Sequence, residues 1–175
     1  MINTILVPTD GSVHAVKAIT FASDIASKYG ARVVLFHSLL FGSSSSEILK
    51  LVEAGQLSEE TLDGLKQRAA LQASIRSTAL FDSNNIPPAV EDLECVGKEL
   101  LESGERIARE HGAETVSRIL TNGEPINCIL KAMDDEKADL IVMGSRGLGN
   151  LEGMLVGSVS HKVSHLAECT VVTVK

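Results

Sequence analysis

Residues 138–147 read Ala138-Asp139-Leu140-Ile141-Val142-Met143-Gly144-Ser145-Arg146-Gly147, an apolar run that ends in two closely spaced glycines. The run is short, and it does not alternate between apolar and polar residues. It therefore predicts a strand that is covered on both faces, as in a parallel sheet between two layers of helices. This stretch favours an α/β fold with a loop directly after a buried strand.

Working outward from this stretch, similar runs predict the remaining strands: Ile5-Leu6-Val7, Arg32-Val33-Val34-Leu35-Phe36-His37, Ser117-Arg118-Ile119-Leu120 and Thr170-Val171-Val172-Thr173-Val174. The segments 12–29, 89–111, 125–133 and 158–166 carry apolar residues at helical spacing. Gly30 and Gly112 are placed to end the first two helices, and Pro125 to open the third. Two glycines within 89–111 indicate close packing on the sheet. Strands that alternate with helices predict an open, five-stranded parallel sheet with helices on both faces.

The length of 175 residues and the hydrophobic content of 44% predict one domain, residues 1–175. Residues 39–88, between the second strand and its following helix, exceed what this fold needs and predict an inserted helical arm. Ser58 is placed as a helix N-cap, Leu57 and Leu62 as a hydrophobic staple, and a helix from Glu59 to about Leu80 follows. The arm is interpreted either as an extra packed helix or as a lid or partner-docking element.

Composition excludes several classes of function. The net charge of -7 and the aromatic content of 3% argue against a nucleic-acid surface, which needs clustered positive charge or stacking platforms. No apolar stretch approaches the ~18 residues that span a bilayer, and no signal peptide is indicated. We therefore expect a cytoplasmic protein without membrane insertion. Cys95, Cys128 and Cys169 form no CxxC pair and are expected to be buried, reduced thiols.

The loop after the fourth strand carries the main candidate site. Gly144-Ser145-Arg146-Gly147 is separated by nine residues from Gly157-Ser158-Val159-Ser160, which opens a helix. Glycines let the backbone approach a phosphate closely, and the free N–H groups of a helix N-terminus attract an anion. The spacing fits neither GxGxxG nor a Walker A loop. The alternative is a glycine-shaped surface loop without a ligand, and Arg146 is interpreted either as solvated or as directed at phosphate.

The loops after the first and second strands supply further candidates. Asp10 or Ser12 is placed to cap the following helix, and the alternative for Asp10 is a ligand of a ribose hydroxyl or of Mg²⁺. The backbone of His37-Ser38 could offer N–H and C=O to an adenine edge, or could be ordinary loop.

These residues carry a resemblance. Residues 5–12, residues 138–147 and Gly157-Ser158-Val159-Ser160 are similar to the universal stress protein family, whose ATP-binding members have the spacing Gly-x2-Gly-x9-Gly-[Ser/Thr]. The resemblance covers both ends of the chain and leaves out the arm. It implies a Rossmann-like fold of the adenine nucleotide alpha-hydrolase type, a homodimer through the last strand at Val171 to Val174, and bound ATP, ADP or AMP with Mg²⁺.

The resemblance also implies roles for individual residues. Gly144, Gly147, Gly157, Ser158 and Ser160 would hold the phosphates and ribose. Pro8, Thr9 and Asp10 would line the ribose and metal side, and the backbone near Ser38 the adenine. The candidate set is completed by Met143, Arg146 and Val159, which adjoin these positions.

The leading hypothesis is a regulatory protein of the stress response that holds ATP with slow or no hydrolysis, and no catalytic residue is assigned. His161 and His165 share one helix face, as metal ligands can, and the alternative interpretation is ordinary surface histidines. The competing hypotheses are a protein-interaction module that binds no nucleotide, and a weak ATPase.

Overall fold

A computed structural model describes residues 1–39, 57–64, 67, 90–148 and 157–175. Its strands are β1 (Thr4–Pro8), β2 (Arg32–Ser38), β3 (Val116–Thr121), β4 (Leu140–Gly144) and β5 (Thr170–Val174). They form one parallel five-stranded sheet in the order β3-β2-β1-β4-β5. The predicted α/β fold class is confirmed.

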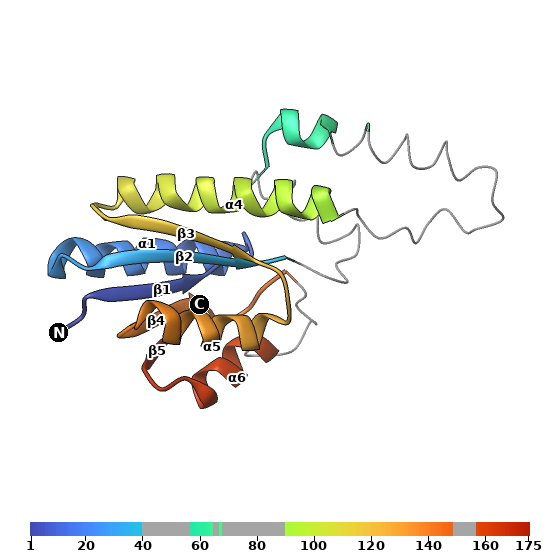
Figure 1. Cartoon of the computed structure of the whole chain (residues 1–175). Helices are drawn as coiled ribbons and strands as arrows, with labels where there is room; N and C mark the ends of the chain where they lie inside the picture. The colour runs from blue at the N-terminus through green and yellow to red at the C-terminus, as the bar shows by residue number, and fades with distance from the viewer. Residues whose placement is uncertain (40–56, 65–66, 68–89, 149–156) are drawn as a thin grey trace.

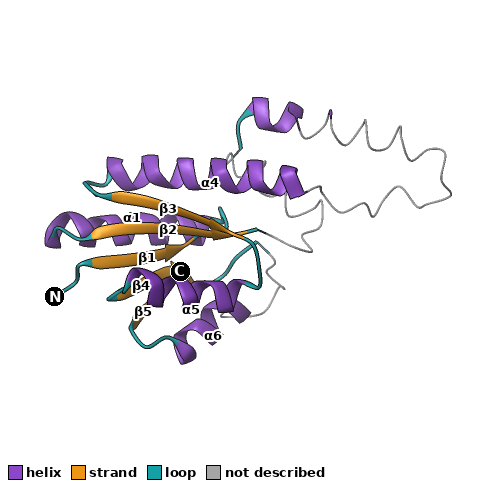
Figure 2. Cartoon of the chain, viewed as in Figure 1, coloured by secondary structure: helices purple, strands orange, loops and turns teal. Residues whose placement is uncertain are grey.

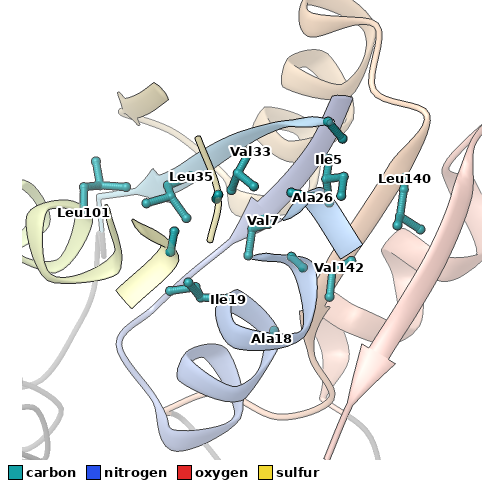
Figure 3. Packing of buried hydrophobic residues seen from close by; sticks show 14 residues of the cluster. Ile5, Val7, Ala18, Ile19, Ala26, Val33, Leu35, Leu101, Leu140 and Val142 are labelled. Carbon is teal, nitrogen blue, oxygen red and sulfur yellow. The ribbon is translucent and has the colours of Figure 1, made fainter. Parts of the chain in front are cut away.

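Helices cover both faces of this sheet (Figures 1 and 2). Helices α1 (Val13–Tyr29) and α4 (Val90–Glu110) share one hydrophobic core with the sheet, and α5 (Pro125–Glu136) and α6 (Ser158–Leu166) share the other. In β1, Ile5 and Val7 enter the first core (Figure 3), whereas Leu6 enters the second. Because successive side chains of a strand point to opposite faces, a strand between two helix layers must be apolar at every position.

The helix ends form where the sequence places them. Ser12 is the N-cap of α1, and its Oγ accepts a hydrogen bond from Ala15 N over 3.2 Å. Gly30 ends α1 in the left-handed conformation at φ 67°, and Gly112 follows α4 at φ 84°. Pro125 occupies the first turn of α5. These residues confine each helix to the length that spans the sheet.

Most of the predicted arm, including the later part of its predicted helix, lies outside the described residues. The predicted start of its helix is confirmed, because residues 59–64 are helical and Thr61 N donates to Ser58 Oγ over 3.2 Å. Leu57 is buried in a small cluster with Val96 and Leu100 of α4, and Leu62 packs against it.

The prediction for the cysteines needs correction. Cys95, Cys128 and Cys169 are free thiols, but each is partly exposed rather than buried. Cys128 and Cys169 are partly buried and pack against the core beneath α5 and α6. Partial burial still raises the pKa of the Cys169 thiol.

Within the ranges that the structure describes, no helix is both long enough and apolar enough to cross a bilayer.

Candidate functional site

The candidate site lies at the carboxyl ends of β1 and β4, which are neighbours in the sheet. Since β2 lies on the other side of β1, the connections diverge at this point, as they do at ligand sites of open α/β sheets. Two hydrogen bonds join the loops that follow these strands. Ser12 Oγ donates to Arg146 O over 3.4 Å, and Leu148 N donates to Asp10 Oδ2 over 2.9 Å. The two loops singled out in the sequence therefore meet.

Asp10 organises this junction. Its Oδ1 accepts from Ser12 N over 3.0 Å, at the start of α1, and its Oδ2 accepts from Leu148 N. Both carboxylate oxygens thus serve backbone N–H groups, although each keeps a further lone pair. Of the two capping candidates, Ser12 is the N-cap of α1, and Asp10 holds the backbone N–H of that residue. A ligand role for Asp10 would use only its remaining acceptor capacity.

Pro8 and Thr9 extend the strand end. Pro8 pairs in register with Phe36 of β2, and Thr9 N donates to Phe36 O over 2.8 Å. The buried Thr9 Oγ1 accepts from Gly11 N over 3.3 Å. Because both residues are tied into the sheet or the turn, Asp10 is the first side chain that reaches the junction.

Two of the motif glycines have a packing reason of their own. A Cβ on Gly144 would lie 2.9 Å from the Cβ of His14, because β4 packs so closely against α1 that no side chain fits between them. A Cβ on Gly147 would overlap Asp10 Oδ2. In the described residues, positive φ among glycines occurs at positions 11, 30, 112 and 123 only, so these two positions need space and not a special backbone conformation.

The second half of the motif is attached to the first by hydrogen bonds to one carbonyl. Gly157, the N-cap of α6, donates its N–H to Ser145 O over 2.7 Å. Ser160 Oγ lies 2.9 Å from the same oxygen and 3.0 Å from Gly157 O. The hydroxyl of the buried Ser160 therefore holds the two halves together, and a ligand would compete with these carbonyls for it.

The remaining residues of the predicted set differ in exposure. Ser158 is exposed in the first turn of α6, where free N–H groups give a positive partial charge. Val159 is half-buried and Met143 is buried, both in the core beneath α5 and α6. Ser158 is thus the side chain of this group that a bound anion could reach directly.

The turn after β4 holds two buried polar atoms without partners. They are Ser145 Oγ and Arg146 Nε, and two further such atoms in the described residues, Glu99 Oε2 and Ser117 Oγ, lie elsewhere. An unpaired buried donor costs about 1–3 kcal/mol, and native sites normally satisfy it. A ligand with acceptor oxygens would satisfy both atoms of the turn. The Nε of the half-buried Arg146 thus lies inside the turn, and Ser145 joins the candidate residues although the glycine spacing did not single it out.

At the end of β2, side chains connect the loops instead of leaving them open. Ser38 Oγ donates to Gly123 O over 2.7 Å. The buried His37 places Nδ1 2.7 Å from Thr9 O. Burial lowers the pKa of His37, and the Thr9 carbonyl and the charge of Asp10 oppose this only in part. The His37 side chain was missed in the sequence, where its one signal is a histidine at the end of an apolar strand.

The donor set limits how a metal could bind. The described ranges contain no group of three His, Cys, Asp or Glu side chains that could hold an ion. His161 and His165 contact each other edge to face, with ring centroids 4.7 Å apart. Among the described residues, Asp10 is the carboxylate that a Mg²⁺ ion at the junction would find, and phosphate oxygens and water would supply further ligands.

Fold and site together define an α/β domain in which two loops at the switch point of a parallel sheet meet beside a helix N-terminus. Residues 1–175 match the model of the universal stress protein family. The chain belongs to this family.

Relatives and solved structures agree. Universal stress protein YxiE of Bacillus subtilis is 29% identical over 175 residues, and a universal stress protein of Thermus aquaticus is 31% identical over 175 residues, with 100% of each chain covered. Universal stress protein UspA from Lactobacillus plantarum has a TM-score of 0.62 at 21% identity, covering 99% of this chain and 97% of that chain. The universal stress protein from Archaeoglobus fulgidus in complex with dAMP has a TM-score of 0.60 at 20% identity, covering 100% and 98%. These likenesses support the fold.

Proposed function

We propose that this protein binds an adenine nucleotide, ATP or its ADP and AMP forms, at the junction of the loops after β1 and β4. The observation that carries the proposal is the pair of unpartnered buried atoms, Ser145 Oγ and Arg146 Nε, beside the N-terminus of α6. Phosphate oxygens would accept from both atoms, from the Ser158 hydroxyl and from the free N–H groups of the helix. The fold neighbours in complex with cAMP and with dAMP support the adenine nucleotide class.

We further propose that the nucleotide is held and is hydrolysed slowly or not at all. A general base must have a free acceptor within reach of the attacking water. Asp10 is the carboxylate of the described residues at the junction. Each of its oxygens accepts a backbone N–H group and keeps one further lone pair, which a bound Mg²⁺ would occupy in place of a water. Mg²⁺, where present, would be held by the phosphates with Asp10 as the protein ligand.

The protein would then act as a cytoplasmic regulator in the stress response, as a homodimer.

Calorimetry with ATP, ADP, AMP and cyclic AMP, each with and without Mg²⁺, tests this function. Gly157→Val is the decisive variant. Its backbone, at φ -71° and ψ 153°, accepts a β-branched residue, but the new Cβ would lie 3.3 Å from Ser145 O, at the entrance to the helix N-terminus. We expect the variant to lose affinity at least about tenfold, or ~1.4 kcal/mol.

His165→Ala, an exposed position at the other end of α6, is the matched control and should bind like the natural chain. Circular dichroism verifies that both variants are folded. Unchanged affinity of Gly157→Val would overturn the placement of the phosphates. Absence of binding by the natural chain to all four nucleotides would instead favour a protein-interaction module.

A further inference from the structure

A small apolar cluster joins residues 57–64 of the arm, which we call the arm base, to the candidate site. Leu57 of the arm is buried with Val96 and Leu100 of α4, and two partly buried leucines pack against them, Leu62 and Leu148. Leu148 comes directly after Gly147, in the turn that follows β4. The cluster therefore brings together three parts of the chain that are far apart in sequence, and one of them belongs to the site.

Leu148 is tied to the site by its backbone as well. Its N–H donates to Asp10 Oδ2 over 2.9 Å, and the same oxygen lies where a side chain on Gly147 would be. The backbone of Leu148 thus contacts the Asp10 carboxylate of the first loop, while its side chain packs on the arm and α4. A movement of the arm base would therefore displace Leu148, whose backbone N–H holds Asp10 in place.

A polar contact fixes the arm base beside this cluster. Ser58 N donates to Glu99 Oε1 over 2.5 Å, at the start of the helical residues 59–64. Burial alone would raise the pKa of Glu99, but the hydroxyls of Thr61 and Ser58 and the Ser58 N–H outweigh it, and the pKa lies below its ordinary value. Glu99 is therefore an anion at a helix N-terminus, where negative charge is favourable.

We propose that residues 57–64 brace the turn at Gly147 and Leu148, and that Leu57 and Glu99 are positioning residues for the nucleotide site. This inference rests on the proposed function. Docking of the arm base fixes the Leu148 side chain, which fixes the Leu148–Asp10 hydrogen bond and the turn that carries Arg146. Docking and nucleotide binding are then linked reciprocally, because whatever stabilises one arrangement favours the other.

Leu57→Ala tests the inference, since Leu57 lies on the arm and outside the loops that would contact nucleotide. We expect its affinity for the nucleotide that the natural chain binds to fall about fivefold or more. Hydrogen exchange at the Leu148 amide, measured without nucleotide, should become faster. Leu57→Met, which conserves volume, should restore both. Glu60→Ala, an exposed change in the same segment, should alter neither.

The two measurements separate the inference from the proposed function. If the natural chain bound no nucleotide, exchange at the Leu148 amide would still report whether the arm braces the turn. Unchanged exchange at Leu148 in Leu57→Ala would overturn the brace. Faster exchange with unchanged affinity would overturn its link to the nucleotide site. Glu99→Ala repeats the test from the α4 side, and the same two changes would support the inference.

Discussion

At the scale of single residues, His37 is a buried ionisable group beside the junction. It is 2% exposed, and its Nδ1 lies 2.7 Å from the carbonyl oxygen of Thr9, the residue before Asp10. A carbonyl accepts only, so Nδ1 carries a proton and donates. Burial lowers the pKa of His37 below its ordinary value of 6.5. The folded protein therefore holds this histidine neutral at a pH where an unfolded chain would protonate it.

This difference predicts a loss of stability in mild acid. Above the ordinary pKa of 6.5, neither state protonates His37 and there is no cost. As the pH falls below 6.5, the unfolded chain gains a proton first, so the free energy of unfolding decreases until the lowered pKa of the folded state is passed. Each unit of difference corresponds to about 1.4 kcal/mol.

Urea unfolding from about pH 8 to about pH 5 measures this dependence. His37→Asn removes the titrating group and keeps a polar side chain, so its stability should depend less steeply on pH in this range. The four other histidines remain in both proteins and their effects cancel. Equal slopes in the two proteins would show that His37 does not titrate as described.

At this scale the sequence singled out two loops that the structure brings together, but it did not show what each residue does in them. The motif spacing located Gly144, Gly147 and Gly157, yet a spacing does not say which way a missing side chain would point. In the structure the space beside Gly144 is filled by α1 and that beside Gly147 by Asp10. The hydroxyl of Ser160 likewise faces two backbone carbonyls. Such contacts depend on tertiary packing, which a single sequence does not encode locally.

At the scale of elements, α4 lies close to the sheet because it carries two glycines on its inner face. A Cβ on Gly97 would lie 2.7 Å from Leu120 Cδ1 and 2.9 Å from His37 Cδ2, whereas a Cβ on Gly104 would lie 3.1 Å from Ile19 Cδ1. The close packing that these glycines indicated in the sequence is confirmed. The two sites differ in how much their neighbours must move.

Alanine substitution should therefore separate the two positions. Replacing Gly by Ala within a helix gains about 1 kcal/mol in propensity, while overpacking costs about 1–3 kcal/mol. At Gly104 the two effects nearly cancel, so we expect Gly104→Ala to change stability little. At Gly97 two side chains on β2 and β3 obstruct the methyl group, so Gly97→Ala should lower the free energy of unfolding. Thermal and urea unfolding of both variants measure the difference, and equal stabilities would contradict it.

The positions of helices and strands were also the part of the structure that the sequence predicted best. Capping residues such as Ser12 and Gly30 act within a few residues of themselves, so the helix ends could be located without knowing the fold. Strand ends were harder to predict. The bounds of β3, Val116 and Thr121, are set by its hydrogen-bonded pairing with β2, a contact between distant parts of the chain. The order of the strands in the sheet depends on contacts across the whole chain, such as the register of Ile5 with Leu140.

At the scale of the whole molecule, the two edges of the sheet differ. On the β3 side, Arg118 forms ion pairs with Glu102 and Glu105 of α4, which place charged side chains beside that edge. At the other edge β5 pairs with β4 on one side, and no other described strand pairs with it. Its apolar residues are half-buried. An open strand edge of this kind can pair with a second chain, and this supports the proposed homodimer through β5.

A proline in β5 tests this dimer. Val174 O accepts from Ser145 N over 2.7 Å, so Val174 faces β4, and the alternation of a strand turns the Thr173 N–H toward the open edge. Thr173→Pro should remove a donor from the dimer while keeping the pairing with β4, since edge strands accept proline. Light scattering should give twice the chain mass of 18.6 kDa for the natural protein and for the control Thr173→Ala, but 18.6 kDa for Thr173→Pro. A natural protein of single-chain mass would refute the dimer, and a dimeric Thr173→Pro would place its interface elsewhere, because that variant lacks the outward N–H on which pairing through β5 depends.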